Sequence, residues 1–98
     1  MIVEIQVLPT PAGTSGSRWE HVEAALALIQ GAGLPYEVGP MGTSVEGEPD
    51  QLWPLLRRVH EATLDSGADG VISVVKISES RQPERRTTMQ QLVGPWRP

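Results

Sequence analysis

Apolar and polar residues alternate at the start of the chain, which predicts a β-strand over residues 2–8. Its odd positions, Val3, Ile5 and Val7, would share one face. Shorter runs of strand-forming residues predict further strands at 36–38, 41–46 and 71–77. The last run is apolar on both faces apart from one serine and one lysine.

Two segments between these strands have the 3.6-residue apolar period of amphipathic helices. The first follows Ser17, which fits a capping box with Glu20 three residues later. The second lies between residues 47 and 67 and contains Pro54 near its start. Because proline lacks the N–H that a helix interior uses, we expect a frayed or 3₁₀ first turn there.

The resulting order of elements is βαββαβ, followed by a tail. This order predicts an α+β, ferredoxin-like βαββαβ sandwich, in which a four-stranded antiparallel sheet carries two helices on one face. We assign this domain to residues 1–79. Residues 80–98 form a short, basic C-terminal extension, and we expect a short helix at residues 88–93.

Two helices cover only one face of such a sheet, and the other face would carry several apolar side chains. A soluble monomer rarely exposes an apolar patch of roughly several hundred Å², so we expect a homo-oligomer formed by face-to-face sheet packing. The alternative is a monomer whose tail folds back over the sheet. Glu4, Gln6 and Lys76 would either pair across the subunit interface or line a small-molecule pocket.

The charge distribution argues against nucleic-acid binding. Residues 1–75 carry three arginines and ten acidic residues, a net charge of −7, whereas residues 76–98 carry five basic and two acidic residues, a net charge of +3. Binding to phosphates needs clustered basic residues, so an acidic body is a poor partner for nucleic acid. We expect the tail to dock on an acidic surface, its own or a neighbour's; a nucleic-acid arm is the alternative.

Cysteine is absent, which excludes disulfides and thiolate chemistry. The first predicted strand follows Met1 without a basic segment or a long apolar run. We therefore expect no signal peptide, no membrane span and a cytoplasmic protein.

Candidate catalytic chemistry is sparse. His21 and His60 lie at helical positions without the spacing of a metal site, so we expect no metal. The loop at residues 13–17 precedes a helix and would either hold an anion or be a plain flexible loop. No Gly-x-Ser-x-Gly motif and no acid/base pair are evident, so we expect neither catalysis nor a cofactor.

The segment Tyr36-Glu-Val-Gly-Pro-Met-Gly-Thr-Ser-Val-Glu-Gly47 resembles the signature of the thiamine-binding protein family, which includes the YkoF-like proteins. The family pattern places Pro-Met-Gly-Thr after a tyrosine, an acid and an aliphatic residue, and before Glu-Gly. Further similarities are His60-Glu-Ala, Gly67-Ala and the strand end Val75-Lys-Ile. The resemblance covers nearly all of residues 1–77, and the tail departs from it.

This resemblance implies dimers assembled into a tetramer by sheet packing, and a site for thiamine or its hydroxymethylpyrimidine part. Thiamine is a cation with an aminopyrimidine ring, which suits carboxylate, amide and hydroxyl partners and stacking on aromatic or thioether groups. A glycine would let the ring approach the backbone closely. We therefore predict a ligand site made of Glu4, Gln6, Glu37, Met41, Gly42 and Thr43. Alternatively, residues 40–43 are a purely structural bend.

Two hypotheses of function follow. The first is a non-catalytic binding protein for thiamine or hydroxymethylpyrimidine, acting in vitamin supply or sensing. The second is a structural or regulatory oligomeric module whose open sheet serves assembly only and binds no small molecule. An enzyme would need an acid/base pair that the sequence does not offer.

Overall fold

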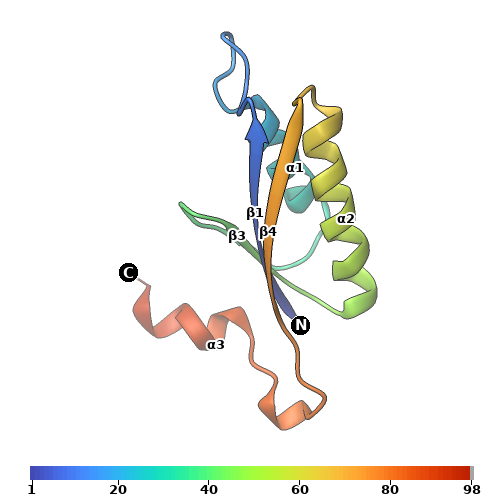
Figure 1. Cartoon of the computed structure of the whole chain (residues 1–98). Helices are drawn as coiled ribbons and strands as arrows, with labels where there is room; N and C mark the ends of the chain where they lie inside the picture. The colour runs from blue at the N-terminus through green and yellow to red at the C-terminus, as the bar shows by residue number, and fades with distance from the viewer. Residues whose placement is uncertain (98) are drawn as a thin grey trace.

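The computed structural model describes residues 1–97 of the 98-residue chain. Its main body consists of one sheet and two long helices. In chain order these are β1 (Ile2–Thr10), α1 (Glu20–Gly31), β2 (Tyr36–Val38), β3 (Thr43–Glu46), α2 (Pro49–Asp65) and β4 (Gly70–Ser78). Each helix joins two strands that are not neighbours in the sheet, and both helices lie on the same side of it (Figure 1).

The strands are antiparallel in the order β2-β3-β1-β4, which is the ferredoxin-like arrangement, so the predicted fold class is confirmed. β1 pairs with β4 along all nine of its residues, from Ile2 opposite Ser78 to Thr10 opposite Gly70. Its pairing with β3 is much shorter and ends where Ile5 lies opposite Thr43. The second half of β1 therefore has a strand neighbour on one side only.

The core lies between the sheet and the two helices. Val3 and Ile5 of β1 and Val45 of β3 are buried and face the helices, as the alternating pattern of β1 predicts. The helices contribute the buried apolar residues Ala25, Ile29, Leu52, Leu55 and Val59. These positions follow the helical period seen in the sequence.

Both helices begin differently from the expectation. Helix α1 begins at Glu20 with Trp19 as its N-cap, so the prediction of Ser17 as the cap is wrong. Helix α2 begins at Pro49, a position that suits proline because the first N–H of a helix has no intrahelical partner. Pro54 consequently lies inside a continuous helix, and the frayed first turn that we expected there is not observed.

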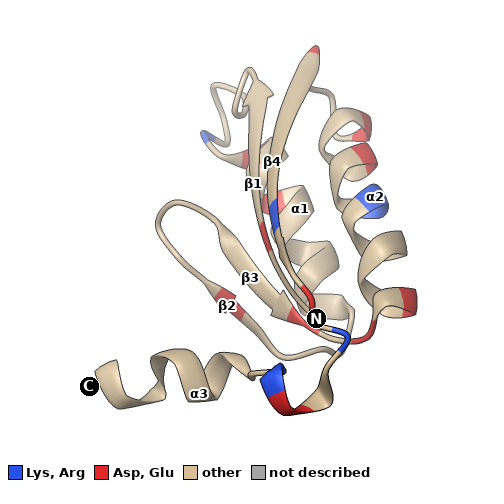
Figure 2. Ribbon diagram, turned by 60° about the horizontal axis from the view of Figure 1, so that its bottom comes forward, with Lys and Arg blue, Asp and Glu red and all other residues tan. Residues whose placement is uncertain are grey.

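The tail crosses to the side of the sheet that α1 and α2 leave open (Figures 1 and 2). It contains a 3₁₀ turn, Pro83–Arg85, then α3 (Met89–Val93) and a second 3₁₀ turn, Gly94–Trp96. The backbone N–H of Met89 donates to the Glu46 carboxylate at 2.6 Å, and Arg97 forms an ion pair with Glu37. Acidic residues of β2 and β3 thus hold the tail at one end of the sheet.

We call the sheet face opposite α1 and α2 the outer face. It exposes a cluster of apolar side chains: Leu8 is 45% exposed, Ile72 66% and Val74 47%. Leu8 and Ile72 lie directly opposite each other on β1 and β4. The tail is attached elsewhere, so it does not cover this cluster as the monomer alternative required. No helix among residues 1–97 has both the length and the apolar character needed to cross a membrane.

The core position of α2 yields a stability prediction. Leu52 is 0% exposed, whereas Leu64 on the same helix is 37% exposed. We expect Leu52→Ala to lower the free energy of unfolding by about 2–5 kcal/mol, because it leaves a cavity in the core. Leu64→Ala makes the same change in helix propensity and should cost less than about 1 kcal/mol. Urea unfolding followed by circular dichroism measures both, and equal losses would contradict this account of the core.

Candidate functional site

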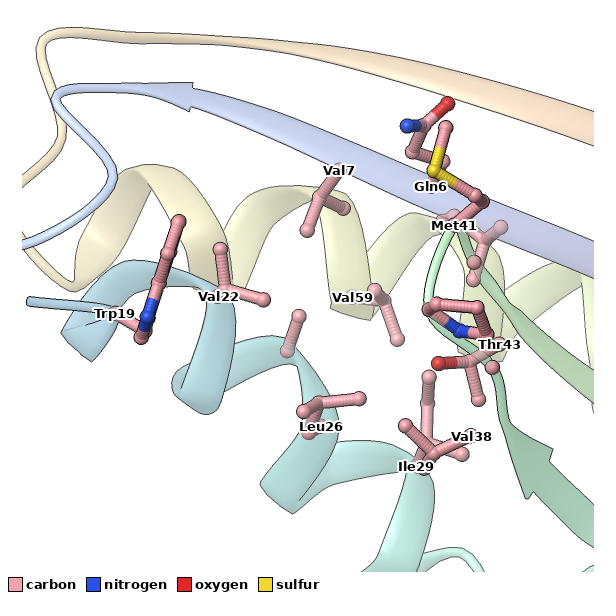
Figure 3. Close-up of a pocket in the computed structure, with 15 residues that line it drawn as sticks. Gln6, Val7, Trp19, Val22, Leu26, Ile29, Val38, Met41, Thr43 and Val59 are labelled. Carbon is pink, nitrogen blue, oxygen red and sulfur yellow. The ribbon is translucent and has the colours of Figure 1, made fainter.

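A cavity of about 320 Å³ lies on the helix side of the sheet, next to the part of β1 that β3 does not reach (Figure 3). Val7 of β1 forms one wall, and Trp19, Val22 and other residues of the first turns of α1 form a second. Residues 38–43, which link β2 to β3, close a third side. The space exists because β3 begins only at Thr43 whereas β1 continues to Thr10.

The cavity is apolar and, among residues 1–97, no charged side chain lines it. Two polar residues are in its lining: Thr43, which is only 4% exposed, and Gln6, which lies at its border. Figure 3 shows the Thr43 hydroxyl pointing into the cavity. Within residues 1–97 every fully buried side-chain oxygen or nitrogen has a hydrogen-bond partner. The Thr43 hydroxyl has no such partner, so it is not fully buried and must contact the open space of the cavity. It is available to a ligand as both donor and acceptor.

Two large side chains flank the mouth of the cavity from opposite ends (Figure 3). Trp19 is 52% exposed and Met41 is 72% exposed. The guanidinium of Arg18 lies 5.2 Å from the centre of the indole ring of Trp19, a cation–π contact that favours this position of the indole. An indole and a thioether beside an apolar cavity are suited to contact the face and edge of a flat ring.

The turn at residues 39–42 packs tightly against β1. The N–H of Gly39 donates to the carbonyl of Gly42 at 2.9 Å, so Pro40 and Met41 form the tip of the turn. A Cβ atom at Gly42 would lie 3.2 Å from Glu4 Cγ and 3.3 Å from the Ile5 carbonyl oxygen. Gly42 therefore has a structural reason to be glycine, in addition to its place in the wall of the cavity.

The structure divides the six predicted site residues between two faces of the sheet. Met41, Gly42 and Thr43 line the cavity. Gln6 borders it, but its side chain extends beside Met41 on the far side of β1 (Figure 3). Met41, Gly42 and Thr43 therefore lie together in the wall of the cavity, with Gln6 at its border.

Glu4 and Glu37 do not belong to the cavity. Both lie on the outer face, in a row across the sheet in which Glu37 is opposite Ser44, Ser44 is opposite Glu4, and Glu4 is opposite Lys76. Glu4 lies 3.8 Å from the Lys76 ammonium, and Glu37 pairs with Arg97 of the tail. The structure therefore separates both glutamates from the cavity residues, because successive residues of a strand point to opposite faces.

Three further lining residues were not among the predicted site residues: the N-cap Trp19, and Val22 and Leu26 of α1. The 3.6-residue apolar period places Val22 and Leu26 on the apolar side of the helix, but both are only partly buried. Their exposure depends on how far β3 extends along β1, which is a property of the sheet. A tryptophan at the start of a helix was the one local signal that could have drawn attention to this region.

The two histidines are used in hydrogen bonds between secondary-structure elements. His21 is buried, and its Nδ1 lies 2.6 Å from the hydroxyl of Ser66. That hydroxyl donates to the Thr63 carbonyl, so it accepts from His21 and ties the start of α1 to the end of α2. His60 and Ser73 make a similar contact at 2.6 Å. Residues 1–97 contain no group of three potential ligands that could hold a metal ion.

Comparison with known sequences gives one family over almost the whole chain. The model of a family described as thiamine-binding protein matches residues 3–95. A UPF0045 protein of Clostridium perfringens is 35% identical over 96 residues, which cover 97% of this chain and 95% of the relative. A UPF0045 protein of Methanothermobacter thermautotrophicus is 33% identical over 86 residues, covering 86% and 87% of the two chains.

Solved structures give the same result. A domain of unknown function, DUF77, from Bacillus cereus has a TM-score of 0.82 at 31% identity and covers 98% of this chain and 88% of that chain. A candidate thiamine biosynthesis/salvage protein from Thermotoga maritima has a TM-score of 0.79 at 26% identity, with 98% and 97% covered. The similarity in both cases includes the tail.

The tight packing of Gly42 is testable. We expect Gly42→Ala to lower the free energy of unfolding by about 1–3 kcal/mol, because its methyl group crowds Glu4 and the Ile5 carbonyl. Gly16→Ala is the control: no atom lies within 4 Å of the added methyl group, and it should leave stability unchanged or slightly raised. Thermal unfolding of both variants measures the difference, and a Gly42→Ala protein as stable as the control would refute the crowding.

Proposed function

Because the chain belongs to the thiamine-binding protein family, we propose that it is a non-catalytic protein that binds thiamine or its hydroxymethylpyrimidine part. The binding site is the cavity between β1, α1 and the turn at residues 39–42. One observation carries the proposal. The Pro-Met-Gly-Thr segment places the hydroxyl of Thr43, which has no protein partner and contacts the open space, in the wall of an apolar cavity that no charged side chain of residues 1–97 lines. We assign the protein to vitamin supply or sensing in the cytoplasm.

The size of the cavity supports a ligand with one ring inside. Small-molecule sites usually enclose roughly 300–1,000 Å³, and about 320 Å³ is at the lower end of that range. A substituted pyrimidine fits such a volume, and the thiazolium ring of thiamine would then point toward the mouth. Trp19 and Met41 lie at that mouth, where they can contact the emerging part of the ligand.

No charged side chain of the described residues lines the cavity, which supports a ligand whose pyrimidine ring lies inside and whose thiazolium ring lies outside. A buried cation without an anionic partner is costly, so the thiazolium ring is better placed in solvent. The aminopyrimidine ring is neutral near pH 7, and hydrogen bonds are sufficient to hold it. The same lining has no titratable side chain for proton transfer, which supports binding without catalysis.

The outer face supports the oligomeric assembly that both hypotheses of function predict, the binding protein and the structural or regulatory module without a ligand. We propose that two copies pack their outer faces together, which buries Leu8, Ile72 and Val74. The row from Glu37 to Lys76 would then lie within the interface and pair across it. This assembly is compatible with ligand binding, because the cavity opens on the helix side of the sheet.

A dimer of dimers needs a second contact, and the free edge of β4 offers one. A groove lined by Trp53, Arg57, Glu61, Val75 and other residues runs between α2 and this edge. Helix α2 packs on both β1 and β4, so its axis lies about half a strand spacing inside β4. If β4 paired antiparallel with β4 of a second copy, the two α2 helices would lie about two strand spacings apart, roughly 10 Å. That spacing is close to the usual distance between packed helices.

The exposed stripe of α2 is self-complementary in this arrangement. It reads Trp53, Arg57 and Glu61, an exposed indole followed by two opposite charges. Two antiparallel copies would set Arg57 of one subunit beside Glu61 of the other. Within one chain Arg57 and Glu61 already form an ion pair at 2.6 Å, so the charges are held in place.

Ligand binding is tested by calorimetric titration with hydroxymethylpyrimidine and with thiamine. We expect both to bind, and Thr43→Val to weaken binding about tenfold through the loss of one hydrogen bond. The thermal midpoint should not fall, because the lost hydroxyl has no protein partner. Ser44→Ala removes a hydroxyl on the outer face and should leave affinity unchanged. A wild-type protein that gives no heat at millimolar ligand would favour the module without a ligand.

Assembly is tested by light scattering. We expect a mass near four times the 10.6 kDa of one chain. Ile72→Lys should leave dimers, because it places a charge in the outer-face contact. Arg57→Glu should disrupt the α2 contact, and the charge swap Arg57→Glu with Glu61→Arg should restore it. A wild-type mass of one chain refutes the assembly, and a swap no better than the single variant refutes the α2 contact.

A further inference from the structure

The backbone of β1 has a second binding capacity that follows from the register of the sheet. In an antiparallel sheet, the N–H and C=O groups of successive residues point alternately to the two neighbouring strands. The N–H of Gly47 donates to the carbonyl of Met1 at 3.0 Å, which extends the register in which Val3 faces Val45 and Ile5 faces Thr43. The odd residues of β1 therefore direct their backbone groups toward β3, and the even residues toward β4.

The pairing with β3 ends at Ile5, so the next odd residue is Val7. Its N–H and C=O point to the side where β3 is missing, and within residues 1–97 no loop or side chain bonds to them. The turn that comes nearest uses its own groups, since the Gly39 N–H bonds to Gly42. The following odd residue is Pro9, which has no N–H. Among the described residues of β1, Val7 thus presents the single unpaired N–H on this edge, with its own C=O beside it, and Pro9 adds only a C=O.

These two groups lie beside the cavity, because Val7 is one of its lining residues and its side chain points into it (Figure 3). Val7 is partly buried, so water reaches its backbone less easily than at an open sheet edge. A partly buried backbone N–H or C=O without a partner is unfavourable, and a ligand that supplies both partners gains affinity. The edge of β1 is therefore a recognition element within the site.

We propose that the Val7 backbone recognises a flat heteroaromatic ring that carries an amino group next to a ring nitrogen. The Val7 N–H donates to the ring nitrogen, and the amino group donates to the Val7 carbonyl. The ring then takes the place of the missing strand neighbour, with Thr43 available to a further polar group. This inference rests on the proposed function and specifies which edge of the pyrimidine is read.

Proline at position 7 tests the donor. It removes the N–H that faces the cavity without removing a bond to β4, and Pro9 shows that the same edge already accommodates proline. Val7→Ala is the matched control for the lost side chain. We expect Val7→Pro to bind hydroxymethylpyrimidine about tenfold or more weakly than Val7→Ala. Equal affinities of the two variants overturn the inference.

Amide hydrogen exchange in the wild-type protein gives a second readout that does not depend on a variant folding. We expect the Val7 amide to exchange quickly without ligand and to become protected when hydroxymethylpyrimidine is added. The Leu8 amide, which bonds to β4, should be protected in both states. A pyrimidine alcohol without the amino group should bind more weakly and protect Val7 less.

The results separate the two proposals. If the wild type binds hydroxymethylpyrimidine while Val7 exchange is unchanged, the inference fails and the proposed function stands. If no amide responds and no heat is released, the proposed function fails, and the inference fails with it.

Discussion

The structure depends on one mismatch in the sheet: β1 pairs with β4 over its whole length but with β3 over less than half of it. Antiparallel pairing fixes which residues face each other, so β3 cannot slide along β1 to cover more of it. The first turns of α1 and the turn at residues 39–42 surround the uncovered part. The apolar cavity and the unpaired backbone of Val7 both result from this arrangement.

Strand alternation separates two kinds of chemistry on the same strands. Charged residues of the sheet lie on the outer face, where Glu4 pairs with Lys76 and Glu37 with Arg97. The helix side at the cavity has hydrogen-bonding groups but, in the described chain, no charged side chain. A ligand bound there would be held by stacking, burial and hydrogen bonds, whereas the charged residues of the sheet pair with each other and with the tail.

The surfaces that remain apolar are extensive for a chain of this size. The outer-face cluster, the groove beside β4 and the tail all expose large side chains; in the tail Leu92 is 53% exposed and Trp96 is 85% exposed. The tail is anchored through Glu46 and Glu37, and its side chains Leu92 and Trp96 remain exposed. One chain thus presents apolar surface on both sides of its sheet.

The order of elements, the buried face of β1 and most of the buried helix positions follow from local patterns along the chain. These depend on periods of two and 3.6 residues, which are local properties. Met41, Gly42 and Thr43 were also found from sequence, because they lie together in one short segment. Helix starts were less predictable: Ser17 and Pro54 both have local signals, and contacts elsewhere moved the helix boundaries.

Which of the candidate residues share a site depends on how the strands and helices pack against each other. Glu4 and Glu37 have suitable chemistry, but the register places them on the outer face, and Trp19 and Val22 enter the cavity from a helix that the sequence assigned to the core. The number of β1 residues that pair with β3 cannot be predicted from the local apolar period of either strand. It results from where the 39–42 turn packs against Ile5, and that contact joins residues more than thirty positions apart.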